Sequence, residues 1–314
     1  MLEDMNAYPK VAILAVYFGS LPPWFSLWLK SCSYNPEFEW ILFTDASLSA
    51  YQLPDNVSAR HLTKVAFCEK LSKELECRVH FTRPYKVCDF KPLFWVLLQE
   101  EPKHYQFWGH CDLDMVFGDL GRFIDRRWFD LYDKLFSLGH FTLYRNDEPT
   151  NRMYLQPHPQ WKSIDLLLDP SNHGFDEHHG VNELWKLHSK RFYDNECVMA
   201  DIDPCISRFE LVGRTNNYYT QVFFWENGKV FRGYYKGRKW CRQEFMYIHF
   251  QKRAFQLNEI RPNAKAFYMT PRGFIARDEG VPVKQQVRWL NAPAASTLSE
   301  LKYRLSKKIK YYLS

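Results

Sequence analysis

Short apolar runs alternate with helix-like segments over the first 120 residues. The apolar run at residues 11–19 has the length and composition of a buried strand, residues 39–45 are predicted as a second strand, and residues 56–62 are predicted as a third. Helices are predicted after or between them at residues 22–32, 65–75 and 92–100. Such an alternation is typical of an α/β sheet in which helices connect the strands.

The pattern changes in the second half of the chain. A strand is predicted at 139–145. Residues 146–215 are polar, rich in histidine and irregular, and we expect them to form an insert that borders one of two substrates. Residues 218–225 and 230–235 flank Asn-Gly, a strong signal for a two-residue β-hairpin. The run 243–255 again has the pattern of a strand.

Composition narrows the class of protein. Of 314 residues, 46% are hydrophobic and 18% aromatic, enough for a large core and unlike a disordered chain. The first ten residues are acidic, unlike a signal peptide, and no apolar run approaches the ~20 residues that span a bilayer, so we expect a cytoplasmic protein. The eight cysteines form no CxxC pair, which argues against zinc and disulfides. Neither GxGxxG nor GxxxxGK[ST] occurs, which disfavours dinucleotide binding and an ATPase.

Basic residues gather near the end of the chain. Within a net charge of +6, residues 298–313 place apolar side chains at helical spacing and lysine or arginine on the other faces. Such a helix can lie peripherally on an anionic membrane, with about 1 kcal/mol from each basic residue. The alternative is a solvated helix packed on its own domain. Nucleic acid is a weaker option, because no stacking-aromatic motif accompanies the cluster.

Two carboxylates follow an aromatic, strand-like run that ends near residue 111. In an extended segment Asp112 and Asp114 point to the same side, so they can converge on one cation. Mg²⁺ and Mn²⁺ prefer such oxygen ligands and are often shared with substrate phosphates, which predicts a diphosphate substrate. The alternative is an Asx-type turn before Gly118.

In the segment 175–185, four polar residues stand before a predicted helix. Asp176 and Glu177 could cap that helix through its free N–H groups. Alternatively, one of them is a base that deprotonates an incoming hydroxyl. The adjacent His178 and His179 are weaker candidates for metal ligands, because neighbouring side chains point in different directions.

A histidine and two cations occur together in the run 243–255. His249 could complete a metal shell begun by two carboxylates, and Lys252 and Arg253 could neutralise a leaving diphosphate. The alternative is a histidine hydrogen-bonded at a sheet edge, beside two solvated cations.

Five motifs in one order carry a resemblance over residues 17 to 253. They are RPYKVCDFKP, WGHCDLDMVFGDL, GHFTLYRN, FDEHHG and YIHFQKR. Together they resemble a bacterial family found among capsule and O-antigen genes, long catalogued as a domain of unknown function and similar to glycosyltransferases of the GT-A fold. The resemblance implies an α/β fold of the GT-A type, with a Rossmann-like mixed sheet flanked by helices.

The resemblance also implies roles for individual residues. A Mn²⁺ or Mg²⁺ ion would be held by Asp112, Asp114 and His249. The nucleotide sugar would be contacted by Tyr17, Phe18, Gly19, Thr44, Asp45, Lys86, Asp89, Lys91 and Lys252. Asp176 or Glu177 would face the acceptor.

The implied function is metal-dependent transfer of a sugar from a nucleotide-diphosphate donor to a hydroxyl of a lipid-linked or oligosaccharide acceptor. Among the possible donors, a UDP-sugar is favoured. The nucleotide half would span residues 1–145, the acceptor-side half 146–255 and a C-terminal extension 256–314. The string DLDMV also matches a haloacid-dehalogenase-like phosphatase, although that motif usually lies on a first strand. A non-catalytic sugar-binding relative is the other alternative.

Overall fold

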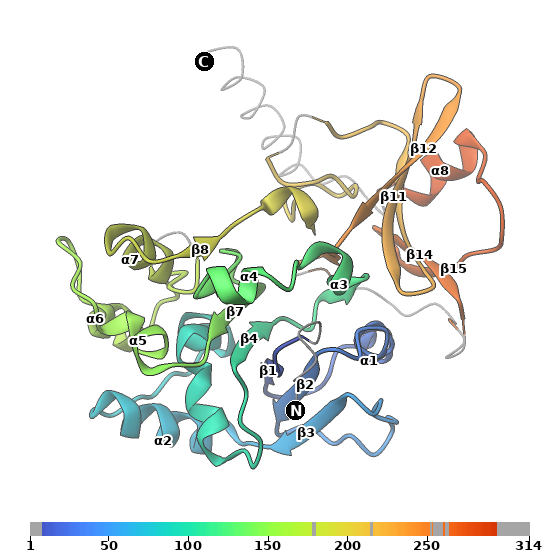
Figure 1. Cartoon of the computed structure of the whole chain (residues 1–314). Helices are drawn as coiled ribbons and strands as arrows, with labels where there is room; N and C mark the ends of the chain where they lie inside the picture. Colours follow the sequence, from blue (N-terminus) through green and yellow to red (C-terminus); the bar gives the residue numbers. More distant parts are fainter. Residues whose placement is uncertain are drawn as a thin grey trace, which may run out of the picture. The chain divides into compact units, whose positions relative to one another are not determined.

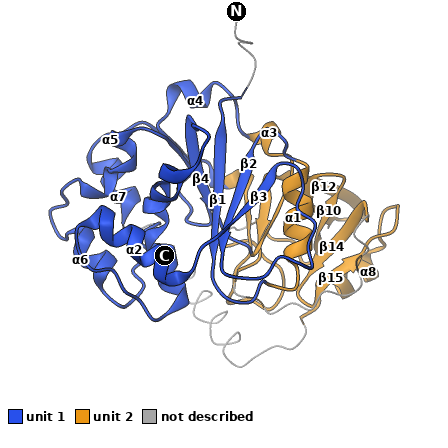
Figure 2. Ribbon diagram, turned by 90° about the horizontal axis from the view of Figure 1, so that it is seen from below, with its two compact units in different colours: residues 1–21, 35–113, 124–196 blue, residues 22–34, 114–123, 197–314 orange. Residues whose placement is uncertain are grey.

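The computed structural model describes residues 8–177, 180–213, 216–251, 253, 260 and 264–293. The predicted helix at 298–313 lies outside these residues, as do Lys252, His178 and His179. The chain forms two compact units, each assembled from separate stretches (Figure 2). Unit 1 comprises Met1–Leu21, Asn35–Leu113 and Ile124–Glu196, and unit 2 comprises Pro22–Tyr34, Asp114–Phe123 and Cys197–Ser314. The boundaries at 145 and 255, which separate the predicted nucleotide half, acceptor-side half and C-terminal extension, stay a prediction.

A seven-stranded mixed sheet forms the centre of unit 1 (Figure 1). Its order is β3-β2-β1-β4-β7-β6-β8, with β1, β2, β3 and β4 parallel and β7 antiparallel to β4. The strands are β1 Val11–Tyr17, β2 Glu39–Thr44, β3 Val57–His61, β4 Phe107–Cys111, β6 Lys134–Leu135, β7 Phe141–Arg145 and β8 Phe192–Tyr193. The predicted α/β class with a mixed sheet is therefore confirmed.

The central strands of this sheet are apolar because both of their faces are covered. All five residues of β4 are buried, as are the first five of β1. Such strands read as continuous apolar runs rather than as alternating ones. Within β4, a Cβ on Gly109 would lie 2.4 Å from the Leu143 side chain and 2.4 Å from the Thr142 carbonyl oxygen, so only glycine permits this approach of β7.

The helical segments of unit 1 are α2 Lys64–Leu75, the 3₁₀ segment η1 Pro84–Glu100, α4 Trp128–Leu131, α5 Glu148–Asn151, η2 Met153–Leu155, α6 Ser163–Leu168 and α7 Val181–Leu187. In two views, α5, α6 and α7 lie on the same side of the sheet as α2 (Figures 1 and 2). The short η3 is Glu196–Val198. The predicted helix at 92–100 is thus only the second half of η1, whose first half is fixed by buried contacts that the local pattern does not reveal.

Lys134 on β6 is a buried cation inside an aromatic enclosure. It is 0% exposed, and its amine lies 5.6 Å from the Tyr144 ring centroid, 5.7 Å from that of Trp185 and 5.8 Å from that of Phe192. The amine also donates a hydrogen bond to the Asn182 side chain. Burial lowers the pKa of Lys134 from 10.5 to about 7.

Replacing Lys134 by methionine is expected to stabilise the protein near neutral pH. The unfolded chain binds more protons than the folded one between pH 7 and 10.5, so folded stability rises with pH across that window. The destabilisation caused by burying a charged Lys134 is complete below pH 7 and is lost above pH 10.5. Chemical unfolding of both proteins should show a gain of roughly 2–4 kcal/mol at pH 6.5 that shrinks toward pH 10. A gain independent of pH would contradict a buried lysine with a lowered pKa.

Unit 2 contains two sheets. A five-stranded antiparallel sheet has the order β12-β11-β10-β14-β15, and a three-stranded sheet has the order β5-β13-β9. The strands are β5 Met115–Phe117, β9 Ala200–Asp201, β10 Gln221–Glu226, β11 Lys229–Lys236, β12 Lys239–Phe245, β13 Tyr247–His249, β14 Ala266–Thr270 and β15 Gly273–Ala276. The helices are α1 Phe25–Ser33, α3 Leu120–Phe123 and α8 Lys284–Leu290. Within the ranges that the structure describes, no helix is long and apolar enough to cross a bilayer.

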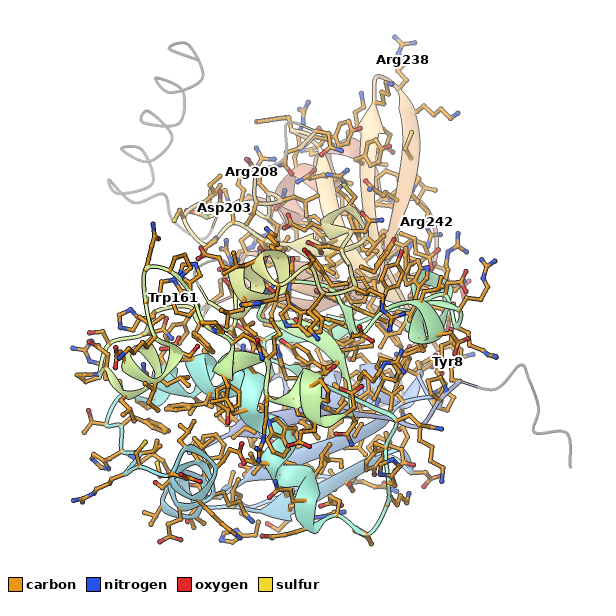
Figure 3. All side chains as sticks on the ribbon, turned by 60° about the vertical axis from the view of Figure 1, so that its left-hand side comes forward. Tyr8, Trp161, Asp203, Arg208, Arg238 and Arg242 are labelled. Carbon is orange, nitrogen blue, oxygen red and sulfur yellow. The ribbon has the colours of Figure 1, made fainter. Side chains whose placement is uncertain are left out.

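The predicted hairpin of unit 2 is confirmed. Strands β10 and β11 pair antiparallel around Asn227 and Gly228, whose φ angles are 48° and 80°. Positive φ at both turn positions is the reason that Asn-Gly is favoured there. The next hairpin, between β11 and β12, presents Arg238 at its tip (Figure 3).

The prediction of one strand over 243–255 is wrong. Strand β12 ends at Phe245, and β13 leaves the large sheet to pair with β5 and β9. In this register His249 lies opposite Met115, the residue after Asp114. The change of sheet depends on partners far away in the sequence, so the local pattern cannot reveal it.

Candidate functional site

A buried lysine organises the carboxyl end of β4 in unit 1. Lys91 Nζ lies 2.8 Å from Asp112 Oδ1 and 3.2 Å from Asp176 Oδ2, and it donates to the Gly139 carbonyl at 2.8 Å. The Lys91 side chain is 5% exposed. One cation therefore joins the first carboxylate of the predicted metal site to one of the predicted acceptor-side acids.

The charges of this cluster depend on each other. Although burial opposes it, the Asp112 carboxylate helps to raise the pKa of Lys91 well above its usual range, so the amine stays charged. Burial raises the pKa of Asp176 to about 7, against the lowering effect of Lys91. Removing Lys91 would leave the buried Asp176 and the partly buried Asp112 without their cation, and an unpaired carboxylate is costly in a protein interior.

Gly139 is a site residue whose role the sequence did not show. Its N–H donates to Glu177 Oε1 at 3.1 Å, and a Cβ at this position would lie 2.3 Å from Asp176 Oδ2. The only sequence signal for this role is that Gly139 begins the motif GHFTLYRN. The interpretation of Asp176 and Glu177 as helix caps is wrong, because α7 begins at Val181 after the N-cap Gly180 and no side chain caps it.

Lys86 and Asp89, which the resemblance places beside the donor, are 1% and 0% exposed. Lys86 Nζ donates to Asp89 Oδ2, to the Leu166 carbonyl and to the Ser171 carbonyl, each at 2.8 Å. Asp89 also accepts hydrogen bonds from the backbone N–H of His173 and Phe175, both at 3.0 Å. We interpret Lys86 and Asp89 as structural residues that fix the segment before α7.

The ends of β1 and β2 border a surface cavity of about 530 Å³. Gly19 and Asp45 line it, and the Gly19 N–H donates to Asp45 Oδ1 at 2.7 Å. Thr44, at the end of β2, is buried, and its hydroxyl accepts from the Ala46 N–H at 3.1 Å. The other cavity residues are Ser20, Leu21, Ala46, Ser47 and Tyr51. Ligands of open α/β sheets bind at this edge, beyond the carboxyl ends of the strands.

The two other residues predicted at this edge, Tyr17 and Phe18, are partly buried. The Phe18 ring packs against Phe67 at 5.7 Å between centroids. Neither Tyr17 nor Phe18 is among the residues that line the cavity.

In unit 2, a histidine lies between two carboxylates. His249 Nε2 is 3.4 Å from Asp114 Oδ1, and its Nδ1 is 2.8 Å from Asp201 Oδ1. Gln251 Nε2 also donates to Asp201 Oδ1 at 2.8 Å. Asp201 was missed by the sequence analysis, because it lies on a two-residue strand with no motif around it.

The histidine cluster has the composition of a divalent-cation site. Although burial lowers it, the charges of Asp114 and Asp201 raise the pKa of His249 to about 10, so the imidazole holds a positive charge between them. A metal ion can replace that charge, because Asp114 Oδ1 and His249 Nε2 are close enough to bind one ion together. Asp201 then resembles the carboxylate that orients a metal-bound histidine through its other ring nitrogen.

Arg253, which the sequence suggested for diphosphate binding, contacts protein carbonyls instead. Its Nη2 donates to the carbonyl of Asp203 at 2.7 Å and to that of Ile206 at 2.6 Å. These bonds hold the 203–207 segment in place. The neighbouring Lys252 is outside the described residues.

Comparison with known proteins gives a family but no activity. No curated protein matches the sequence. Similar solved structures include mouse xyloside xylosyltransferase 1 in its apo form, at 11% identity over 78% of this chain and 99% of that chain, with a TM-score of 0.44. A likeness this weak carries no conclusion about activity. The profile of a family of unknown function, DUF6625, matches residues 13–278, and the chain therefore belongs to that family.

Proposed function

We propose that this protein is a metal-dependent glycosyltransferase that moves a sugar from a nucleotide-diphosphate donor to a hydroxyl of a growing bacterial surface polysaccharide. The observation that carries the proposal is the pair Asp112 and Asp114 after β4, in which each carboxylate has a charged partner. Asp112 pairs with Lys91, and Asp114 faces His249. This arrangement fixes two acids one residue apart beyond the carboxyl end of β4, the edge at which open α/β sheets generally bind their ligands.

The donor would bind at the carboxyl ends of the parallel strands in unit 1. The cavity beside Gly19 and Asp45 would hold the nucleoside, and the Asp45 carboxylate could accept hydrogen bonds from the ribose hydroxyls. UDP is our first choice of nucleotide, on the resemblance of the sequence to the GT-A enzymes.

The metal would be Mn²⁺ or Mg²⁺, held by Asp114 and His249, with Asp112 as the third residue of the predicted set. When bound, the ion would supply Lewis-acid stabilisation of the negative charge on the leaving diphosphate. Asp201 would fix the His249 ring, and Lys91 would fix the Asp112 carboxylate.

Glu177 is our candidate for the base. It is partly exposed, whereas Asp176 is 4% exposed and therefore suits a positioning role toward Lys91. The acceptor hydroxyl would lose its proton to Glu177 while its oxygen bonds to the anomeric carbon. The bond from that carbon to the diphosphate oxygen would break with inversion.

The acceptor and the cellular setting follow from the resemblance to the capsule and O-antigen family. We propose a lipid-linked or oligosaccharide acceptor at the inner face of the plasma membrane, with peripheral contact through residues 298–313. Vesicle flotation with and without anionic lipid would test that contact.

Asp201→Asn is expected to weaken Mn²⁺ binding by about 10- to 100-fold, because the amide holds the His249 ring less firmly and adds no negative charge. Isothermal titration with Mn²⁺ alone measures this effect. Asp203→Asn is the matched control, since the Asp203 carboxylate accepts from the Cys205 N–H at 2.9 Å within its own loop. Equal affinity in Asp201→Asn and the wild type would remove Asp201 from the site.

The proposed function is tested by calorimetric titration with UDP-, GDP-, CMP- and dTDP-linked sugars, first with Mn²⁺ and then with EDTA. Tight binding of one donor only with metal supports the proposal, and transfer to an acceptor is then followed by mass spectrometry. Release of inorganic phosphate without sugar transfer would favour the phosphatase. Metal-dependent donor binding without transfer or hydrolysis would favour the non-catalytic relative.

A further inference from the structure

A second cavity of unit 1, with a volume of about 580 Å³, lies between the end of α2 and the segment from η2 to α6. Its walls include Glu74, Tyr154, His158, Trp161 and Ser163. None of these residues belongs to the Lys91 cluster or to the cavity at Gly19. The proposed donor chemistry therefore leaves this cavity unexplained.

One wall of the cavity is a fixed aromatic platform. The rings of Trp161 and His158 stack with centroids 4.1 Å apart and planes inclined by 17°. His158 is itself held, because its Nδ1 accepts from the Gln160 N–H at 3.2 Å and its Nε2 lies 3.4 Å from Glu183 Oε2. The platform is thus ordered before any ligand arrives. Trp161 lies on the chain that leads into α6, and its side chain is labelled in Figure 3.

Glu74 supplies a polar group with a fixed orientation in the wall of the same cavity. Its side chain is 9% exposed, and its Oε1 accepts from the Tyr154 hydroxyl at 2.7 Å and lies 3.5 Å from Arg152 Nε. A carboxylate held in this way is a directional acceptor for a ligand hydroxyl.

A second polar group of the wall lacks a partner. Ser163 is 8% exposed, and its buried hydroxyl has no hydrogen-bond partner in the part of the chain that the structure describes. Buried polar groups are nearly always paired, so this hydroxyl is a candidate for pairing with a ligand or water in the cavity.

The balance of charge selects a neutral ligand. Glu74 and Glu76 are offset by Arg152 and Lys162 around the same cavity. An aromatic platform, a fixed carboxylate and an unpaired hydroxyl suit a molecule with an apolar face and many hydroxyl groups.

We propose that this cavity is a carbohydrate-binding subsite that stacks one sugar ring of the acceptor glycan on Trp161 while Glu74 accepts its hydroxyl hydrogens. This assignment of the ligand as acceptor rests on the proposed glycosyl transfer. A contact with a sugar other than the reacting one raises the effective concentration of the acceptor, so it lowers KM more than it changes kcat.

The test is affinity electrophoresis of the full chain through native gels that contain dextran, xylan, galactomannan or barley β-glucan, without metal or nucleotide sugar. The wild type should be retarded by at least one polysaccharide. Trp161→Ala should lose that retardation, with a dissociation constant raised at least about 10-fold. Trp289→Ala is the matched control, because Trp289 is 54% exposed in unit 2 and should leave retardation unchanged.

A second variant guards against misfolding. Glu74→Gln keeps the shape of the side chain and should weaken retardation while thermal melting shows a folded protein. The proposal is overturned if no gel retards the wild type, or if Trp161→Ala is retarded as strongly as the wild type.

Donor titration with Mn²⁺ separates this proposal from the proposed function. Trp161→Ala should bind the nucleotide sugar as the wild type does. If Trp161→Ala binds the donor normally and is retarded by the glycan like the wild type, the subsite is wrong and the proposed transferase stands. If the wild type binds no donor but its retardation by the glycan depends on Trp161, the proposed transferase is wrong and the sugar-binding site stands.

Discussion

Asp114→Asn is expected to abolish metal-dependent binding of the nucleotide sugar, with a loss of at least about 100-fold in Mn²⁺ affinity. The Asp114 oxygen lies 3.4 Å from His249 Nε2, so the two atoms are placed to share one ion. The amide is nearly the same size but carries no charge, and a hard cation prefers a carboxylate. Calorimetry with Mn²⁺ alone, followed by the donor, measures both effects.

The matched control for this prediction is Asp119→Asn. Asp114 comes just before strand β5, whereas Asp119 lies beyond its other end. The Asp119 side chain is 40% exposed and lies 3.9 Å from Lys229 rather than beside His249. It should bind metal and donor like the wild type. If Asp114→Asn or Asp112→Asn retains full transfer activity, the assignment of the two carboxylates is wrong.

Lys91→Met should lower the free energy of unfolding by about 3–5 kcal/mol, because it leaves the buried Asp176 and the partly buried Asp112 without their cation. The affected groups are Asp112, 2.8 Å from the Lys91 amine, and Asp176, 3.2 Å from it. Methionine fills a similar volume, so the loss reports charge rather than a cavity. Denaturant unfolding at pH 7 measures the change.

A double variant tests whether the acids are the cause. Lys91→Met with Asp176→Asn should recover part of the lost stability, since residues of one ion-pair cluster are not additive. Lys103→Met is the surface control, because Lys103 pairs with Glu39 at 57% and 39% exposure and should change stability by less than about 1 kcal/mol. Strict additivity in the double variant would contradict the cluster.

Much of the fold could be predicted from the sequence, because strands and hairpins leave local signals. The strand predicted at 11–19 is β1, and Asn227-Gly228 forms the expected turn between β10 and β11. An apolar run is a property of neighbouring residues, so one sequence contains it. The same local information marked Asp112 and Asp114 as a pair.

Partners that come from distant residues left no such signal. Asp201 lies 48 positions before His249, and Gly139 lies 48 positions after Lys91, yet each pair is in hydrogen-bond contact. The resemblance places Lys86 beside the donor, whereas the structure buries it against Asp89, and we interpret it as a structural residue. Residue type alone cannot distinguish these two outcomes.

The sequence by itself therefore determined the α/β class, the first strands and the two acids after β4, because hydrophobic period and short motifs are local. The tertiary structure alone decided that β13 leaves the large sheet to pair with β5, which brings His249 opposite Met115. It also decided that Lys91 joins Asp112 to Asp176. These contacts depend on how burial and charge are satisfied across the whole fold, and no segment of the chain contains that information.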